Sequence, residues 1–266
     1  MRHRSMTILI ALSLIAMGAC TSDDKSGSDG GTAKDSKVGA DLLVIPDAAP
    51  GSDAAAALIE VSGTVEISQD GPGQGPPVEG ATVELLGVSP AKQVTTAADG
   101  KYKFTVPKGV ALFIHAHKAG LIGDVTGILI PQATTTAVTH NLELLEMTMV
   151  NEVAKSLGTT IKADKAIATI SPADRNNFKL AFKAAISAKS EGSFVFEKDA
   201  PVKGDQTKTD GEPQVIFYNV DTGTTTIDVT VVNDPLSFCQ PALGKNTAYP
   251  LIAGSFTEIE FICATP

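Results

Sequence analysis

Two histidines stand close together in the chain and raise the question of a metal site. His115 and His117 are two positions apart in a run that alternates like a β-strand, and side chains at i and i+2 of a strand leave the same face of the sheet. Such a pair is a known geometry for two zinc ligands, but a site needs at least a third ligand. The only other histidine of the exported part is His140. We therefore interpret the pair as a polar patch on a sheet surface and expect no metal site and no cofactor.

No set of residues in the chain has the spacing of a catalytic centre. Glycine-flanked serine elbows, the H-E-x-x-H zinc motif and the EF-hand loop are all missing from the sequence. Four aspartates of the second half fall in expected loops, where calcium is an alternative to solvated turn carboxylates, but their spacing matches no defined calcium loop. These are Asp199, Asp205, Asp210 and Asp221. The sequence predicts a protein without enzymatic activity.

The first residues have the three parts of an export signal. A positive start is followed by an apolar run from Met6 to Met17 and by two small residues before Cys20. A run of this length is too short to cross a bilayer, which needs about 20 residues. The tetrapeptide Met17-Gly18-Ala19-Cys20 resembles the bacterial lipobox, in which the cysteine is acylated and becomes the new N-terminus. The resemblance implies a signal peptide at residues 1–19 and acyl chains such as palmitate on Cys20; an ordinary signal peptide cut after Gly18 is the alternative.

An acylated cysteine has consequences for location and for the other cysteines. Several acyl chains, at about 0.8 kcal/mol per buried methylene, anchor a protein stably in membrane lipid. Thr21 stands where an aspartate would favour inner-membrane retention, so we expect an outer-membrane lipoprotein that faces the periplasm or the cell surface. Cys239 and Cys263 then remain as a pair in an oxidising compartment, where a disulfide is the expected state. Two buried thiols or a metal site are the alternatives for this pair.

The composition excludes some partners. The formal net charge is −9, whereas binding nucleic acid needs a concentrated surface of lysine and arginine. Tryptophan is absent and tyrosine occurs three times, so flat aromatic platforms for bases or sugar rings are scarce. We expect no nucleic acid partner, and instead a protein or cell-surface ligand that the sequence does not identify.

Residues 20–57 differ in composition from the rest of the chain. They are rich in Ser, Asp, Gly and Ala, with one short apolar patch at Leu42–Ile45. Too little apolar surface is present to offset the entropy of ordering. We expect a disordered, lipidated tether between the anchor and the folded part.

Alternation of apolar and polar residues begins at Leu58. The run from Lys101 to Val106 alternates strictly, which predicts that Tyr102, Phe104 and Val106 face a core and the lysines face water. Similar runs continue to residue 145 and make about seven short strands, the pattern of an antiparallel sandwich.

Four segments of this region resemble the carboxypeptidase regulatory-like domain. They are VSGTV at Val61–Val65, PVEGATVEL at Pro77–Leu85, ADGKYKFTVPKG at Ala98–Gly109 and KAG at Lys118–Gly120. The resemblance covers residues 58–145 and implies a transthyretin-like, prealbumin-type β-sandwich. It implies no catalytic residue and no particular function, because this family occurs as an accessory module in many unrelated proteins.

Residues 146–160 have the spacing of a connecting helix. Leu145, Met149, Val153 and Leu157 fall on one i, i+4 row, and Gly158 stands where a helix would end. We expect this apolar stripe to pack against one or both sandwiches; a partner-binding helix is the alternative.

Residues 161–266 repeat the β pattern in weaker form and predict a second sandwich of similar type. Strand-like runs occur at Val215–Val220, Thr224–Val231 and Phe256–Cys263. Residues 171–190 are ambiguous, because Ser171-Pro172-Ala173-Asp174 resembles a helix start whereas the apolar residues from Phe178 to Ile186 also alternate. The β pattern of the neighbouring residues favours a strand.

The sequence therefore predicts an all-β chain with tandem antiparallel Ig-like or prealbumin-like β-sandwiches and one connecting helix. The function that follows is that of a non-enzymatic, membrane-anchored envelope or cell-surface lipoprotein that presents β-sandwich binding modules. The alternative is an accessory subunit of an envelope enzyme or export complex, with the helix near Met149 as its docking element. The sequence leaves open the identity of the ligand, the side of the membrane and the oligomeric state.

Overall fold

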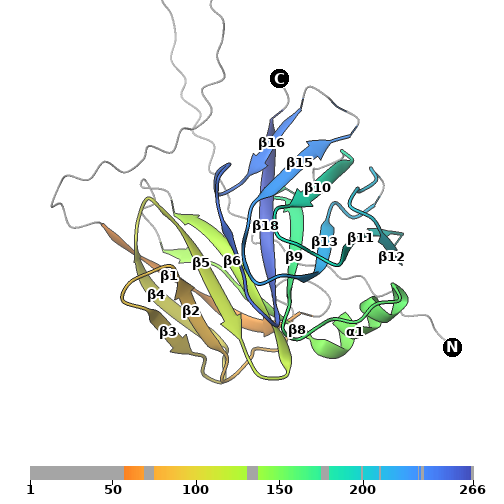
Figure 1. Cartoon of the computed structure of the whole chain (residues 1–266). Helices are drawn as coiled ribbons and strands as arrows, with labels where there is room; N and C mark the ends of the chain where they lie inside the picture. The colour runs from red at the N-terminus through yellow and green to blue at the C-terminus, as the bar shows by residue number, and fades with distance from the viewer. Residues whose placement is uncertain are drawn as a thin grey trace, which may run out of the picture. The chain divides into compact units, whose positions relative to one another are not determined.

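A computed structural model describes most of the chain beyond residue 56. The described residues are 57–68, 75–130, 137–174, 180–198, 200–209, 211–232, 234 and 237–264. The predicted signal peptide, Cys20 and all of the predicted tether except Ala57 lie outside these ranges, as do Asp199 and Asp210. The described part is built of β-strands and one α-helix, so the predicted all-β fold with a single helix is confirmed (Figure 1).

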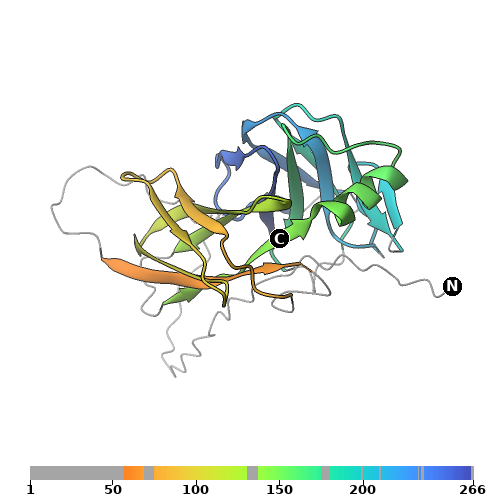
Figure 2. The same cartoon turned by 90° about the horizontal axis from the view of Figure 1, so that it is seen from below.

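The first half of the described chain is a two-layered β-sandwich. One layer is the antiparallel order β3-β2-β5-β6, and in the other β1 pairs antiparallel with β4 and parallel with β7 and β8. Figure 2 shows the two layers from a second direction. The strands are β1 (Leu58–Ile67), β2 (Thr82–Leu86), β3 (Lys92–Thr95), β4 (Lys101–Pro107), β5 (Val110–His117), β6 (Leu121–Ile130), β7 (Val138–Thr139) and β8 (Leu142–Glu146).

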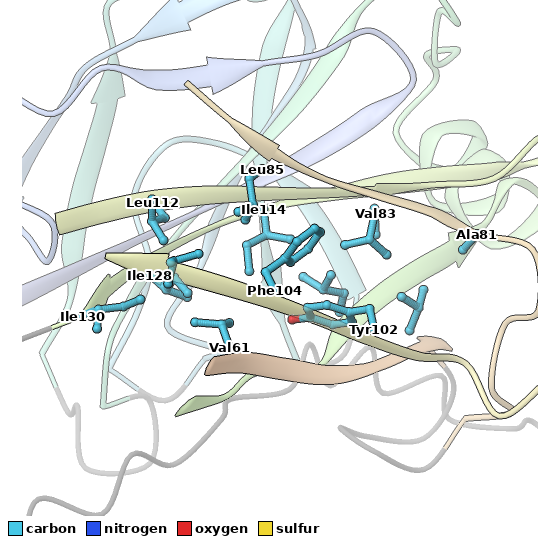
Figure 3. Close-up of a cluster of buried hydrophobic side chains, with 14 of the residues drawn as sticks. Val61, Ala81, Val83, Leu85, Tyr102, Phe104, Leu112, Ile114, Ile128 and Ile130 are labelled. Atoms are coloured by element: carbon cyan, nitrogen blue, oxygen red, sulfur yellow. The ribbon is translucent and has the colours of Figure 1, made fainter. Parts of the chain in front are cut away.

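The core of this sandwich follows from the alternation of its strands. In β4, Tyr102, Phe104 and Val106 are buried, whereas Lys101 and Lys103 between them are exposed, as predicted. Figure 3 shows these rings meeting the aliphatic side chains of β1, β2, β5 and β6 between the two layers. Because side chains of a strand alternate between the two faces of a sheet, the other residues of β2 and β5 leave the opposite face of their layer.

The second half is organised around a sheet with the order β12-β11-β13-β9-β18. The pairs β10–β15 and β14–β17 contribute side chains to a second core against one face of this sheet. The strands are β9 (Ala166–Pro172), β10 (Phe182–Ile186), β11 (Gly192–Glu197), β12 (Ala200–Lys203), β13 (Val215–Val220), β14 (Gly223–Thr225), β15 (Ile227–Val231), β16 (Phe238–Pro241), β17 (Tyr249–Leu251) and β18 (Ser255–Ala264).

The ambiguous segment contains strands where the structure describes it. Ser171 and Pro172 end β9, and β10 pairs antiparallel with β15. Phe182 and Ala184 of β10 are buried and Lys183 is exposed, so the alternating pattern and not the helical one is confirmed for this stretch. Residues 175–179, with Phe178, lie outside the described residues.

The helix α1 (Met147–Ser156) lies where the apolar spacing predicts it. It ends in a Schellman motif around Gly158, which has φ +66°. The N–H of Gly158 donates to the carbonyl of Lys155 at 3.0 Å, and the N–H of Thr159 donates to the carbonyl of Ala154 at 2.9 Å. Glycine adopts this left-handed conformation without the steric cost that a side chain brings.

Helix α1 covers the second face of the central sheet. Val150, Val153 and Leu157 pack against a third core that includes Phe194, Phe196, Ile216 and Tyr218. Strands β9 and β13 are consequently buried along their whole length, because one face meets the second core and the other meets the helix. The predicted packing of the apolar stripe against a sandwich is confirmed.

One sheet continues from the first half into the second. Strand β18 runs parallel to β6 on one side and to β9 on the other, so the order passes without a break from β3 to β12. These parallel pairs, and those of β1 with β7 and β8, depart from the predicted antiparallel sandwiches. The division into domains at 58–145 and 161–266 stays a sequence prediction, since the sheet does not separate the two halves.

Candidate functional site

The outer face of β2 and β5 brings three metal-ligand side chains together. Glu84 of β2 lies directly opposite His115 of β5 in the strand register, and His117 follows on the same face. The Nδ1 atom of His115 lies 2.7 Å from the Oε1 atom of Glu84, and the rings of His115 and His117 stack with centroids 4.8 Å apart. One ligand atom from each of the three residues lies within 4.8 Å of the other two.

The start of β18 holds His115 from the other side of the ring. His115 is buried, and its Nε2 atom lies 3.0 Å from the hydroxyl oxygen of Ser255. Gly123 of β6 leaves the space for this contact, because a Cβ atom at that position would collide with the Ser255 hydroxyl and the Ala116 carbonyl. Burial lowers the pKa of His115, an effect that the hydrogen bond to Glu84 partly opposes, so the ring favours its neutral form.

The spacing of the sequence indicates the two histidines of this cluster but neither Glu84 nor Ser255. Glu84 lies between the buried residues Val83 and Leu85 of β2, so its side chain points to the outer face of the sheet. This alternation is the one local sign that Glu84 could meet outward-facing residues of a neighbouring strand. Its pairing with His115 depends on the register of β2 against β5, and Ser255 comes from 140 residues further along the chain. Neither relation can be read from local spacing.

His140 does not join this cluster. Its backbone N–H donates to the carbonyl of Ser62 at 2.8 Å, and its own carbonyl accepts the hydroxyl of Tyr102 at 2.6 Å. The Nε2 atom is buried and has no hydrogen-bond partner within the described ranges. Burial lowers its pKa to about 4. His140 is therefore a neutral side chain of the first sandwich at physiological pH.

A buried carboxyl group lies on the inner face of β6. The hydroxyl of Thr126 donates to Oδ1 of Asp124 at 2.7 Å, and the backbone N–H of Glu143 donates to Oδ2 at 3.0 Å. Burial raises the pKa of Asp124 well above its ordinary value, and the nearby carboxylates of Glu258 and Glu143 raise it further. The fold therefore favours the protonated acid. Local sequence does not mark this residue, because its burial depends on the pairing of distant strands.

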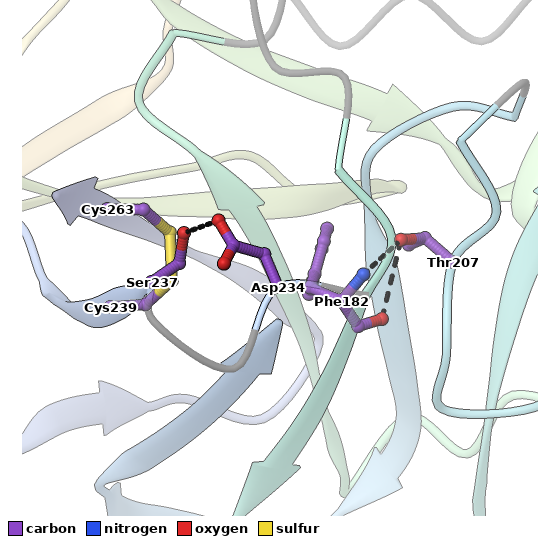
Figure 4. Close-up of a disulfide and its surroundings, with 6 residues drawn as sticks. All are labelled: Phe182, Thr207, Asp234, Ser237, Cys239 and Cys263. Carbon is purple, nitrogen blue, oxygen red and sulfur yellow. Dashed lines mark hydrogen bonds between the residues drawn. A yellow bond between two sulfur atoms is a disulfide. The ribbon is translucent and has the colours of Figure 1, made fainter. Parts of the chain in front are cut away.

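The cysteines of the second half form the predicted disulfide. Cys239 of β16 and Cys263 of β18 lie opposite each other in an antiparallel pair and are bonded through their sulfur atoms. Figure 4 shows the bond next to the loop before β16, in which Ser237 donates to Asp234 at 2.6 Å. The same view contains Thr207, whose hydroxyl accepts the N–H of Phe182 at 3.0 Å and so holds the start of β10. The alternatives of two free thiols or a metal site at this pair are wrong.

The two described aspartates of the calcium alternative face lysines and not each other. Asp205 lies 3.4 Å from Nζ of Lys183, and Asp221 lies 2.9 Å from Nζ of Lys165. The ion pair with Lys165 lowers the pKa of Asp221. Each carboxylate thus belongs to its own exposed ion pair, and the two do not form a shared oxygen cage.

An apolar cavity of about 50 Å³ lies between α1 and the central sheet. Val150, Val153, Phe196, Ile216 and Phe256 are among the side chains that line it. The cavity belongs to the third core, where the partly buried side chains of the helix meet the aromatic rings of β11 and β13.

Comparisons with known proteins identify no family for this chain. No family model matches it, and no curated protein matches it. The resemblance to the carboxypeptidase regulatory-like domain therefore depends on the sequence segments given above. The structure describes no helix with the length and apolar character needed to span a bilayer.

Several solved structures match this chain at a low level of similarity. The Bacillus anthracis TIE protein matches with 13% identity and a TM-score of 0.26, over 76% of this chain and 33% of that one. A streptococcal ancillary pilin matches with 14% identity and a TM-score of 0.26, over 68% of this chain and 58% of that one. The shaft pilin spaA from Lactobacillus rhamnosus GG matches with 12% identity and a TM-score of 0.23, over 80% and 99%. At these TM-scores the similarity carries no argument about function.

Proposed function

We propose that this chain is an exported, membrane-anchored envelope protein without enzymatic activity, whose β-sandwich structure presents binding surfaces outside the cytoplasm. The observation that carries the proposal is the disulfide between Cys239 and Cys263. Disulfides persist in oxidising compartments and are rare in the cytosol, where thiols are kept reduced. A cross-strand disulfide therefore supports export.

The anchor is proposed from the N-terminal sequence. Met17-Gly18-Ala19-Cys20 has the form of a lipobox, and acyl chains on Cys20 would hold the protein in membrane lipid. The proposed location is the outer membrane, with the folded part in the periplasm or on the cell surface. A net charge of −9 argues against nucleic acid as the partner, so the proposed partner is a protein or another cell-surface ligand.

The alternative of an accessory subunit has less support, because the helix proposed as its docking element packs against the sheet. That alternative needs a free apolar stripe on the helix near Met149. In the structure Ala154 and Leu157 are buried and Val153 packs against the sheet. The packing of the helix against the sheet therefore supports the first function over this one.

A substitution of the anchor residue tests the proposal. We expect wild-type protein expressed in a Gram-negative host to enter the detergent phase after phase separation, and Cys20→Ser to be processed differently and to enter the aqueous phase. Cys239→Ser is the matched control, because it removes a cysteine without removing the anchor and should stay in the detergent phase. Wild-type protein in the aqueous phase, or found reduced in the cytoplasm, would overturn the proposal.

A further inference from the structure

We propose that Glu84, His115 and His117 form a binding site for a single zinc ion. The proposal is independent of the membrane anchor, because all three ligands belong to the folded part of the chain. It departs from the sequence-based expectation of a polar patch without a metal, because the structure places Glu84 beside the two histidines as a third potential ligand.

The donor set suits zinc. Two imidazole nitrogens and one carboxylate oxygen are a set that Zn²⁺ uses with three protein ligands and an open fourth position. Imidazole ligands favour zinc and its transition-metal neighbours over Mg²⁺ and Ca²⁺, which prefer oxygen alone. The three ligand atoms already lie within 4.8 Å of one another, on two adjacent strands whose register fixes their spacing.

The hydrogen bonds of His115 prepare it as a ligand. A metal-bound histidine usually donates its second ring N–H to a nearby oxygen acceptor, such as a carboxylate, a carbonyl or water. The Ser255 hydroxyl, 3.0 Å from the Nε2 atom of His115, can accept this hydrogen bond. When Nε2 carries the proton, Nδ1 is left with a free lone pair 2.7 Å from the Glu84 carboxylate. An unprotonated Nδ1 of His115 and the Glu84 carboxylate oxygen are both acceptors, and they repel each other at this distance unless a proton or a metal ion joins them. In the tautomer with the proton on Nδ1, that proton forms a hydrogen bond to Glu84. In the tautomer with the proton on Nε2, we propose that a zinc ion is bound by both atoms.

Access and adaptability distinguish the three ligands. The side chain of His115 is 6% exposed, whereas that of Glu84 is 34% exposed and His117 is exposed. Zinc–ligand distances of about 2.0 to 2.2 Å place neighbouring ligand atoms roughly 3.3 Å apart. Glu84 and His117 can therefore rotate to reach the ion while the buried His115 stays fixed. The exposed side of the site leaves room for water as the fourth ligand.

The test is a titration with zinc alone. The full chain is purified in detergent without a polyhistidine tag, stripped with a chelator, and titrated with ZnCl₂ by isothermal calorimetry; Co²⁺ then reports the coordination geometry through its visible spectrum. We expect one ion per chain and a tetrahedral cobalt spectrum. His117→Gln and Glu84→Gln should each weaken binding at least about tenfold, and Ser255→Ala about tenfold through the positioning of His115.

Two controls distinguish binding at this site from unspecific binding of zinc to the acidic surface of the protein. Glu79 is an exposed glutamate shortly before β2, and Glu79→Gln should leave zinc affinity unchanged. The metal-free His117→Gln and Glu84→Gln variants should melt within a few degrees of wild type, since His117 is exposed and Glu84 partly so. Absence of saturable zinc binding by the folded wild type would overturn the proposal. Zinc binding that survives both His117→Gln and Glu84→Gln would overturn it as well.

Discussion

The protonation of His140 is opposed by the fold. Its pKa is lowered to about 4 by burial, whereas an unfolded histidine titrates near 6.5. Between these values the unfolded state binds more protons than the folded state, so the free energy of unfolding decreases as the pH falls through this window. The full shift corresponds to at most about 3 kcal/mol.

Replacing His140 by leucine should remove this part of the acid sensitivity. We expect urea unfolding of wild type to lose about 2 kcal/mol more than His140→Leu between pH 7 and pH 4.5. His117→Gln, compared with wild type in the presence of a chelator so that no metal contributes, is the control and should follow wild type, because its side chain is exposed. An equal loss in wild type and His140→Leu would show that His140 is free to protonate in the folded protein.

Asp124 has the opposite effect on the pH dependence. Burial raises its pKa well above the ordinary value, so the folded state keeps a proton that the unfolded state loses above about pH 4. The free energy of unfolding therefore decreases as the pH rises through this window.

Asparagine at position 124 keeps the shape of the side chain and carries no charge. It can accept the N–H of Glu143, and the Thr126 hydroxyl can turn to accept its amide hydrogen. We expect Asp124→Asn to melt about 2 to 4 °C higher than wild type at pH 7, with the difference vanishing near pH 4, as measured by calorimetry. A lower melting temperature at pH 7 would mean that an ionised Asp124 is stabilised in the fold.

At this scale local sequence indicates which side of a strand a residue occupies, but not its neighbours. The alternation in β4 predicts the burial of Tyr102 and Phe104. Of the three cysteines, Cys20 is assigned to the lipid anchor, so Cys239 and Cys263 remain and are predicted to form the disulfide. The contact of His115 with Ser255 and the burial of Asp124 depend on how β6 pairs with β18. That pairing joins segments more than 100 residues apart, and it cannot be predicted from the spacing of residues within either segment.

Among the elements, α1 depends on the sheet beneath it. An isolated helix of ten residues is marginal in water, so packing must supply most of its stability. Leu157 is buried at its C-terminal end. We expect Leu157→Ala to lower the free energy of unfolding by about 2 to 4 kcal/mol.

Glu152→Ala is the matched change on the exposed face of α1. Its effect should stay within about 0.5 kcal/mol. Chemical denaturation followed by far-ultraviolet circular dichroism measures both variants. Comparable losses for Leu157→Ala and Glu152→Ala would contradict the packing of the helix against the central sheet.

The elements themselves are largely predictable from periodicity. The strands of the first half and the helix, with its end at Gly158, follow from spacing alone. The segment around Phe182 cannot be assigned from its own residues, because helical and alternating patterns coincide there. Pairing with β15 decides it, and this is a tertiary effect that overrides local propensity.

For the whole molecule, the continuous sheet should couple the two halves. Strand β18 pairs with β6 and β9, and Phe113 of β5 packs edge-on against Tyr249 of β17 with ring centroids 5.7 Å apart. Unfolding either half would therefore expose apolar surface of the other. We expect a single calorimetric transition with equal van't Hoff and calorimetric enthalpies. Two separated transitions would instead support the independent domains predicted at 58–145 and 161–266.

Export with acylation at Cys20 is the central claim, and the mass of the mature protein tests it most directly. Protein extracted from membranes with detergent, without reductant, is measured intact and after digestion. We predict an N-terminal peptide that begins at Cys20 and carries acyl chains, together with a linked pair of peptides that contain Cys239 and Cys263. An unacylated peptide that begins at Ala19, or a chain that keeps Met1 and has free thiols at 239 and 263, would contradict the claim.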